Sequence, residues 1–277
     1  ALSAGRGGTL EAAGVGEVCT SPTHRRRGLS RALMKDAIGA MEGIGVDVSL
    51  LHAAPELAGF YNEGGGYESV TSEWSVVTLG SFAGGGDDEG GLVVRLASFP
   101  GDTERLMGLH RLYSESRFAG CVVRTEDYWN DYVSKEIGDS LYVLVSEMME
   151  GEGKIAGWLS IRPRGGRFQL RDFGVDRDMI GTSRAMRRLL MDALPKPEKE
   201  AVTELHLPTA ILEEVQSECK EEGKASASSS FIDWDAGVKE ENDVGWMYRA
   251  VRKTEGGGVK GAIEEGARHL IWPTDSF

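Results

Sequence analysis

Three consecutive arginines followed by a glycine stand where the sequence indicates the start of a helix. They belong to the segment "CTSPTHRRRGLSRALMKDAIGAM", which begins at Cys19. The first N–H groups of a helix have no intrahelical acceptor, and the helix dipole adds partial positive charge there. Guanidinium groups donate charge-assisted hydrogen bonds, and a glycine lets a ligand approach the backbone closely. The segment therefore predicts a site for an anion such as a pyrophosphate. The alternative is a solvated basic patch that caps an amphipathic helix.

The segment differs from two widespread phosphate-binding motifs. It has no Gly-Lys-Ser/Thr, which a P-loop requires, and it lacks the three-glycine spacing of the Rossmann fingerprint. The five histidines of the chain show no spacing typical of metal ligands, so no metal site is expected. The anion is thus expected to be held by arginines and backbone amides.

Composition and charge exclude several classes of function. The chain has 277 residues, enough for two domains, and a formal net charge of -13. This acidity argues against a general nucleic-acid binder and favours a cationic partner. Three widely spaced cysteines indicate a reducing compartment without a disulfide framework, so we expect a cytoplasmic protein. No apolar run approaches the length of a transmembrane helix, so no membrane partner is expected.

The elements around the arginines follow from periodicity and from turn residues. The run "GVGEVCTSP" predicts a strand that stops at Pro22. Apolar residues including Leu29 and Leu33 then recur at helical spacing as far as Met41, and the glycines at 43 and 45 are expected to end this helix. We next expect a strand over 46–54, a short helix and a glycine-rich turn over 55–67, and a strand over 72–80.

The rest of the chain continues the alternation of sheet and helix. Strands are expected near 92–96, 140–148, 154–162, 167–175, 202–208, 231–234 and 246–251, and helices near 103–116, 126–136, 182–194 and 211–222. Residues 220–230 are expected to form a low-complexity surface loop. The expected organisation is a first domain over 1–79, a glycine-rich linker over 80–91, a second domain over 92–253, and a C-terminal helix and tail over 254–277.

The segment from Val18 to Val70 resembles the GNAT acetyltransferases. Their signature is Arg/Gln-x-x-Gly-x-Gly/Ala before a helix; Arg25 and Gly28 match it, and Ser30 stands where the signature has Gly or Ala. The runs "SPTHRRRGLSRALM", "LLHAAPELAGFY" and "GGGYESVT" are most similar to the Eis-type (enhanced intracellular survival) branch, which has tandem GNAT domains. Fungal lysine N6-acetyltransferases have a comparable two-part layout and are the near alternative.

The resemblance implies an α+β fold of two tandem GNAT-like domains, each a mixed, mostly antiparallel sheet flanked by helices. Too few residues precede the arginine loop for the opening strands of that sheet, so we expect an N-terminally truncated first domain. The second half has no glycine among the arginines of "RDMIGTSRAMRRLL" and is expected to have lost its coenzyme site. It would then form a wall of the substrate cavity.

The resemblance also implies the residues that bind acetyl-CoA. In this fold the strand before the loop splays from its neighbour, and the pantetheine arm enters the gap and pairs with its backbone. The pyrophosphate would rest on the N–H groups that follow. The implied binding residues are Val18, Cys19, Thr20, Arg25, Arg26, Arg27, Gly28, Leu29 and Ser30.

Two catalytic residues are implied in the same way. Tyr61 would be the general acid that protonates the coenzyme A thiolate, and the alternative is a packed amphipathic aromatic. In Eis-type enzymes a terminal Phe carboxylate acts as base, so Phe277 is the second candidate. The alternative for this apolar end is a tail that covers apolar surface.

The function that follows is an acetyl-CoA-dependent N-acetyltransferase that acts on a primary amine by direct attack. Small polyamines, aminoglycoside-like compounds and protein lysines all remain open as acceptors. Asp172, Asp233 and Asp235 are candidates for binding a cationic acceptor, and the alternative makes them surface or turn carboxylates. The competing class is a non-catalytic acyl-CoA-binding or scaffold protein of the same fold, and association into a homo-oligomer is left open.

Overall fold

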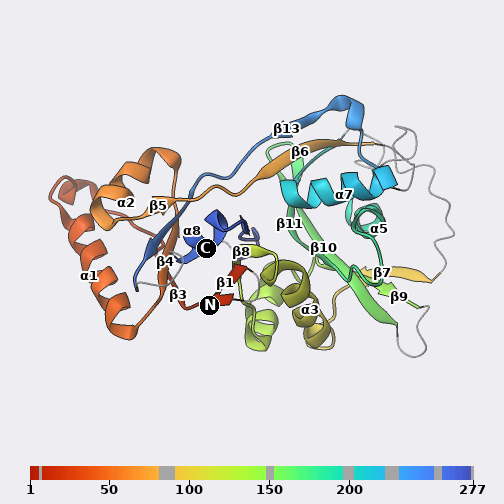
Figure 1. The fold of residues 1–277 in the computed structure, drawn as a ribbon, viewed down its shortest axis with the longest axis horizontal. Helices are drawn as coiled ribbons and strands as arrows, with labels where there is room; N and C mark the ends of the chain where they lie inside the picture. The colour runs from red at the N-terminus through yellow and green to blue at the C-terminus, as the bar shows by residue number, and fades with distance from the viewer. Residues whose placement is uncertain are drawn as a thin grey trace.

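The computed structural model describes residues 1–5, 8–80, 91–147, 153–195, 203–221, 231–252 and 258–275. Most of the expected linker and most of the expected low-complexity loop lie outside these ranges, as does Phe277. Two lobes are visible in Figure 1, with helices α1 and α2 in one and the largest sheet in the other. Within the described ranges, no helix is both long and apolar enough to cross a membrane.

The first lobe is built on a four-stranded sheet in the order β3-β4-β14-β5. These strands are β3 (Ala12–Gly14), β4 (Val48–His52), β14 (Trp246–Ala250) and β5 (Glu68–Ser69). Helices α1 (Leu29–Ile44) and α2 (Ala58–Gly65) contact each other, and their apolar side chains share one cluster with Leu51 of β4. The expected helices and the strand over 46–54 are therefore confirmed, with small shifts in their ends.

The buried stripe of α1 differs from the expected one. Met34, Ile38 and Met41 are buried, whereas Leu33 is 67% exposed and Leu29 is also exposed. Spacings of three and four residues define both stripes, so periodicity alone did not choose between them. The helix also runs through Gly43 and ends at Ile44, because Gly45 adopts the left-handed conformation that closes a helix.

The strand expected over "GVGEVCTSP" is wrong in its position. Strand β3 ends at Gly14, after pairing in parallel with Val48–Leu50 of β4. One more backbone bond follows, from the Val15 amide to the Leu50 carbonyl, at 2.8 Å. The chain then continues toward the arginine loop outside the sheet. The two parallel strands thus part at Val15.

The second lobe is built on a seven-stranded sheet in the order β13-β6-β12-β11-β10-β9-β7. Only the β11–β12 pair is parallel among its described pairs. In sequence order the strands are β6 (Trp74–Leu79), β7 (Leu92–Leu96), β9 (Tyr142–Ser146), β10 (Lys154–Arg164), β11 (Arg167–Val175), β12 (Thr203–Pro208) and β13 (Val238–Glu240). Six of them were expected from the sequence, and β13 was not.

Helices cover this sheet. Helix α3 (Thr103–His110) contacts β10, and α5 (Thr182–Ala193) packs against both β10 and α7 (Thr209–Glu221). The helix expected over 103–116 continues beyond α3 as a π-helix, and the one expected over 126–136 is a π-helix (Tyr128–Val133) followed by α4 (Ser134–Ile137). Their apolar faces form the largest core cluster, which contains Trp158.

A third sheet lies between the lobes and has the order β15-β8-β1-β2. Its strands are β1 (Leu2–Gly5), β2 (Gly8–Leu10), β8 (Phe118–Val122) and β15 (Arg268–His269), and helix α8 (Gly258–Glu264) contacts β1 and β8. Strand pairing crosses the segment limits expected from the sequence. Strand β6 lies within the segment 1–79 but joins the larger sheet, and β14 lies within the segment 92–253 but joins the first-lobe sheet. The proposed division into 1–79 and 92–253 describes segments of sequence, and whether either folds alone stays a prediction.

The strand expected near 231–234 is wrong. A single bridge joins Ile232 to Leu79, and the chain then makes a 3-10 turn over Trp234–Ala236. The Asp233 carboxylate accepts hydrogen bonds from the backbone N–H groups of Asp235 and Ala236. This cap matches the turn alternative for Asp233.

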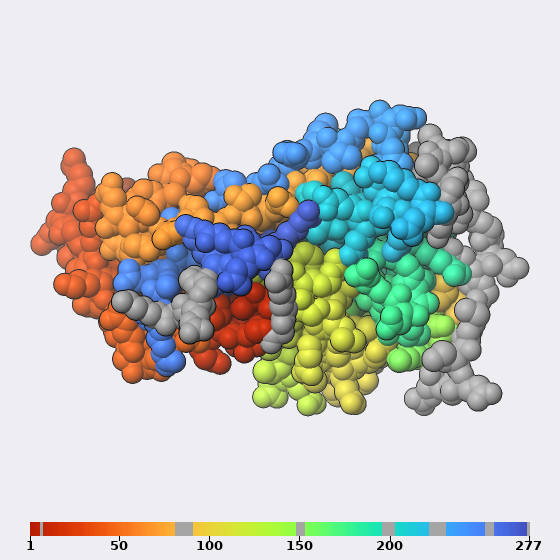
Figure 2. All heavy atoms as spheres, in the orientation of Figure 1, coloured from red at the N-terminus to blue at the C-terminus, as the bar shows by residue number. Residues whose placement is uncertain are grey.

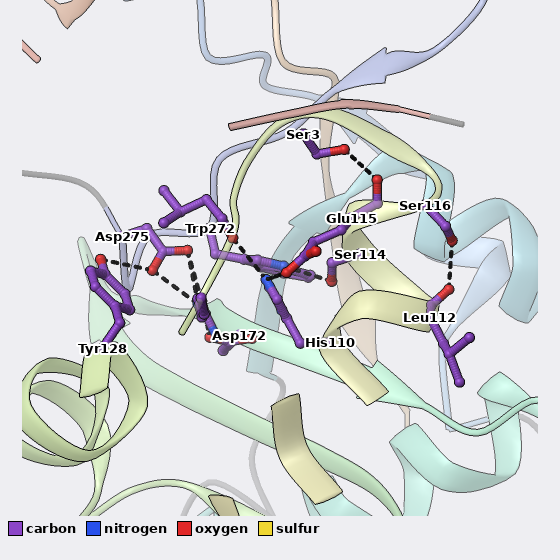
Figure 3. Close-up of polar contacts among 12 residues, drawn as sticks. Ser3, His110, Leu112, Ser114, Glu115, Ser116, Tyr128, Asp172, Trp272 and Asp275 are labelled. Atoms are coloured by element: carbon purple, nitrogen blue, oxygen red, sulfur yellow. Dashed lines mark hydrogen bonds and ion pairs between the residues drawn. The ribbon is translucent and has the colours of Figure 1, made fainter. Parts of the chain in front are cut away.

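A buried ion cluster joins the C-terminal segment to the second lobe. The Arg124 guanidinium donates to Asp172 at 2.6 Å and to Asp275 at 2.8 and 3.0 Å, and all three side chains are fully buried. Figure 3 shows Asp275 facing Tyr128, whose hydroxyl donates to it, while Asp172 accepts from the indole N–H of Trp158. The expectation that Asp172 is either a substrate ligand or a surface carboxylate is therefore wrong.

The segment that ends at Asp275 is packed as well as paired. Trp272 is fully buried, and its indole N–H donates to Ser114 at 3.1 Å (Figure 3). Figure 2 shows the C-terminal segment, in dark blue, lying across the middle of the molecule between the two lobes. The described part of the tail is thus a structural element that joins them.

We predict that Asp275→Ala destabilises the protein strongly. The substitution leaves Arg124 buried with one carboxylate instead of two, and removing one partner of a buried ion pair costs about 3–5 kcal/mol. The free energy of unfolding is measured by urea denaturation. Asp131→Ala is the control, because its ion pair with Lys135 is exposed and such pairs contribute about 1 kcal/mol or less. A loss below about 1 kcal/mol for Asp275→Ala would show that the cluster does not fasten the tail.

Candidate active site

The arginine loop connects the end of β3 to helix α1. A 3-10 turn over Pro22–His24 leads into the arginines, and Gly28 begins the helix with a left-handed φ of 77°. A Cβ at Gly28 would meet nothing within 4 Å, so the glycine is required by its backbone conformation and leaves the approach to the helix open. No side chain caps the first turn of α1, so its amides are available to a ligand.

The loop lines an open cavity of about 630 Å3. Its walls also include His24, Arg31 and Phe60, and they bring together all nine residues that the sequence predicted for coenzyme binding. The cavity is lined by Val18, Cys19, Thr20, His24, Arg25, Arg26, Arg27, Gly28, Leu29, Ser30, Arg31 and Phe60. Helix α1, which begins here, lies at the left end of the molecule in Figure 1.

The positive charge of the loop is not neutralised by the protein. Across the ranges that the structure describes, no carboxylate forms an ion pair with Arg25, Arg26 or Arg27, and all three are exposed. Arg26 also holds a left-handed φ of 60°, which is uncommon for a residue with a side chain. Such strain is found at ligand sites, and an anion would supply the missing counter-charge.

Hydrogen bonds join the segment before the arginine loop to the loop itself and to the start of α1. The hydroxyls of Thr20 and Ser30 hydrogen-bond to each other at 2.5 Å. The Arg25 Nε–H donates to the Thr20 carbonyl at 3.2 Å. Ser30, the one departure from the family signature, therefore ties the start of α1 to the extended segment before the loop.

Tyr61 lies on α2 and is 8% exposed, within the cluster that contains Met34, Leu51 and Tyr67. It does not line the loop cavity, although its neighbour Phe60 does. Its hydroxyl makes no hydrogen bond within the described part of the chain, whereas the Tyr67 hydroxyl bonds to Ser49 at 2.7 Å. Burial raises the pKa of Tyr61, so the phenol is protonated at neutral pH.

A second cavity, of about 380 Å3, lies where the first-lobe sheet meets the larger sheet. Its lining comes from the ends of β4 and β6, the β10–β11 hairpin, β12, the start of β14 with the segment before it, and the C-terminal segment. These residues are His52, Trp74, Arg162, Arg164, Arg167, Gln169, His206, Glu241, Asn242, Asp243, Trp246, Ile271 and Pro273.

A histidine–carboxylate pair stands in this second cavity. The imidazole Nε2 of His52 lies 3.0 Å from Oδ1 of Asp243, and the Gly245 amide donates to the same oxygen at 3.0 Å. The Trp246 ring contacts the imidazole edge-on, at 4.9 Å between centroids. Burial opposes the ionisation of Asp243, but these hydrogen bonds outweigh it, and the pKa of Asp243 lies below its ordinary value.

Sequence reasoning did not single out His52 for this role. One local signal was available, since His52 is the exposed last residue of an otherwise buried strand, "VSLLH". Its partner Asp243 lies far along the chain in a loop, and no local pattern connects the two residues. Phe277, the other expected catalytic residue, lies outside the described residues.

The comparisons with known proteins agree with this architecture. Residues 3–70 match the model of the acetyltransferase (GNAT) domain family. No curated protein sequence matches the chain. The fold is similar to that of a conserved protein of unknown function from Enterococcus faecalis V583, with a TM-score of 0.59, 17% identity and coverage of 91% of this chain and 57% of that one.

Two further solved structures have the same kind of fold. Eis1 from Mycobacterium abscessus aligns with a TM-score of 0.53 and 19% identity over 90% of this chain and 59% of its own. A tandem GNAT protein from the clavulanic acid biosynthesis pathway aligns with a TM-score of 0.50 and 12% identity over 89% of this chain and 77% of its own.

The identities are low, so these likenesses concern the fold. The chain spans less than two thirds of the length of the Enterococcus and Mycobacterium proteins. Residues 3–70 match a GNAT acetyltransferase domain. The chain has the α+β fold of tandem GNAT proteins, which the resemblance of its arginine loop and flanking segments had implied.

Proposed function

We propose that the chain is an acetyl-CoA-dependent N-acetyltransferase that acts on a primary amine. The observation that carries the proposal is the arginine-loop cavity, where three unneutralised guanidinium groups surround an uncapped helix N-terminus. This donor set suits a pyrophosphate, which needs both positive charge and convergent N–H groups. GNAT domains generally use acetyl-CoA as the acyl donor, and residues 3–70 match that family.

The parting of β3 and β4 supplies a place for the pantetheine arm. Beyond Val15 the chain leaves the sheet, so the backbone groups around Val18 and Cys19 are not used in a ladder. The Thr20 carbonyl is occupied by Arg25, which leaves the segment before it for the coenzyme. The segment around Val18 and the arginine loop line one cavity, so the pantetheine arm and the pyrophosphate of one coenzyme could bind there together.

Acetyl transfer to an amine needs a base, because a protonated amine is not a nucleophile. His52 is the candidate base, and Asp243 is placed to orient its imidazole. The imidazole would accept the amine proton while the nitrogen attacks the thioester carbon. This is the same pairing of base and orienting carboxylate that general-base catalysis uses elsewhere.

The tetrahedral intermediate then releases a thiolate when its C–S bond breaks. Tyr61 would protonate this sulfur, because its hydroxyl is protonated and unpaired within the described chain. Leu51 packs in the same cluster as Tyr61, and successive strand residues face opposite sides of a sheet. The acid and the base would thus approach the end of β4 from its two faces.

We predict that acetyl-CoA binds wild type and that Gly28→Glu weakens binding by at least about tenfold. The new carboxylate repels the pyrophosphate, and Coulomb repulsion at a few ångströms costs on the order of 1–4 kcal/mol near a surface. Isothermal titration calorimetry measures the dissociation constant. Gly28→Gln is the matched control, since it brings the same backbone strain and nearly the same side chain without the charge, and Gly39→Glu adds the same charge to an exposed position of the same helix. Equal affinity of Gly28→Glu and wild type would refute the assignment of this cavity.

We predict that Tyr61→Phe lowers kcat by about 10²–10⁴-fold, the usual contribution of a general acid, with little change in the dissociation constant of acetyl-CoA. The assay follows release of the coenzyme A thiol with spermidine and lysine as acceptors. Tyr67→Phe is the control, because it removes a hydroxyl from the same cluster. An unchanged kcat would leave Tyr61 as a packing residue, and a wild type that acetylates no amine would favour the scaffold alternative.

We predict that His52→Gln lowers kcat at pH 7 and that the deficit shrinks toward pH 10. Without the base, the reaction depends on the fraction of amine that is already neutral, and a lysine-like amine has a pKa of about 10.4. The measurement is a pH–rate profile of both proteins. A deficit that is constant across this range would contradict the role.

The same assay tests the other candidate base, the Phe277 carboxylate. Two glycines added after Phe277 move that carboxylate by several ångströms. If the tail supplies the base, this extended chain loses activity while His52→Gln keeps it. The reverse pattern assigns the base to His52.

A further inference from the structure

One wall of the second cavity is unusually positive. Arg162 and Arg164 lie two residues apart on β10, and their partners across the hairpin are Gln169 and Arg167 on β11. Residues two apart on a strand face the same side, so these four side chains share one face of the hairpin. All four line the cavity that also contains His52.

The carboxylates of the cavity are already occupied. Glu241 makes a two-pronged ion pair with Arg167, which holds the pKa of that carboxyl below its ordinary value. Asp243 accepts from His52. Within the described chain, Arg162 and Arg164 have no carboxylate partner. Glu136 and Glu241 act on these two guanidinium groups only from beyond ion-pair distance, and the cavity lining contains three arginines but two carboxylates, so positive charge is in excess there.

A single amide oxygen is shared by these two guanidinium groups. Gln169 Oε1 accepts from Arg162 Nε at 3.0 Å, from Arg162 Nη2 at 2.9 Å and from Arg164 Nη1 at 3.1 Å. Each guanidinium has five N–H donors, so most of them remain for a ligand. Burial and the neighbouring charges of Arg171 and Arg164 lower the pKa of Arg162, and Glu136 acts in the opposite direction.

We propose that Arg162 and Arg164 bind an oxyanion of the acetyl acceptor, a carboxylate or a phosphate, while the amine of the same molecule lies at His52. The inference rests on the proposed function, because it names the class of acceptor that the site takes. Guanidinium forks match planar and tetrahedral oxyanions, and a cavity of about 380 Å3 is within the usual range for a small ligand. The acceptor is then a small zwitterionic amine, in place of the purely cationic one that the net charge suggested.

The test compares acceptors that differ only in the anionic group. Lysine and cadaverine differ by a carboxylate, and O-phosphoethanolamine and ethanolamine differ by a phosphate. Binding is followed by tryptophan fluorescence, because Trp74 and Trp246 line the cavity, and turnover is followed by release of coenzyme A. The variant is Arg162→Gln/Arg164→Gln, and the control is Lys135→Gln, which removes an exposed positive charge outside the cavity.

For wild type and for the control, at least one anionic acceptor should bind about tenfold or more tightly than the matching amine that lacks the anionic group. Charge-assisted hydrogen bonds to the arginines would cause this difference. In the double variant this preference should fall to within about threefold of unity. The pair that shows the preference identifies carboxylate or phosphate as the recognised group.

Two results would overturn the inference: cadaverine and ethanolamine binding as tightly as their anionic counterparts, or a preference that survives in the double variant. The proposed function is judged separately by turnover. Arginine-dependent binding without acetylation would retain the oxyanion site and reject the enzyme, whereas rapid acetylation of cadaverine over lysine would retain the enzyme and reject the site.

Discussion

The buried guanidinium of Arg124, held between Asp172 and Asp275, is the interaction on which the arrangement of the two lobes depends. Asp172 belongs to the central strand β11 of the large sheet, and Asp275 ends the described tail. The tail between β15 and Asp275 contributes Ile271 and Pro273 to the second cavity. Fastening the tail therefore shapes the space in which an acceptor would lie. Charges so deeply buried persist only when they are paired.

A second constraint is the point where β3 and β4 part. Parallel pairing ends at Gly14, so the chain can turn away and approach α1 through the arginine loop. Because β3 pairs only with Val48–Leu50, the last two residues of β4 have no described strand partner on that edge. Tyr61 packs in one cluster with Leu51 of that strand, and His52, its last residue, lines the second cavity. The arginine-loop cavity thus lies beyond this break, and the second cavity includes His52 at the end of the same strand β4.

Local signals in the sequence were sufficient for the loop and for most elements. The arginines, Gly28 and the helical period after them lie within one short segment. Strands β10 and β11 are separated by the glycine turn at residues 165 and 166, which is also a local signal. The left-handed φ of Gly28 was not predicted, but it is a conformation that glycine adopts readily. The loop and these elements could be predicted because each depends on neighbours in the chain.

The features that sequence reasoning missed depend on distant contacts. Asp172 looks like a surface carboxylate until Arg124 is brought beside it, and His52 has no role until Asp243 faces it. Leu33 and Met34 each belong to a stripe of residues with helical spacing. Packing of α1 against the rest of the first lobe decides that Met34 is buried and Leu33 is exposed. Strand pairing that crosses residue 79 likewise depends on the tertiary fold.

The most direct test of the central claim is a crystal structure of the protein with acetyl-CoA. We expect the pyrophosphate on the amides and guanidinium groups between Arg25 and Ser30, and the thioester at the end of β4 between Tyr61 and His52. Acetyl-CoA bound elsewhere, or an arginine loop that stays empty at saturating coenzyme, would contradict this expectation.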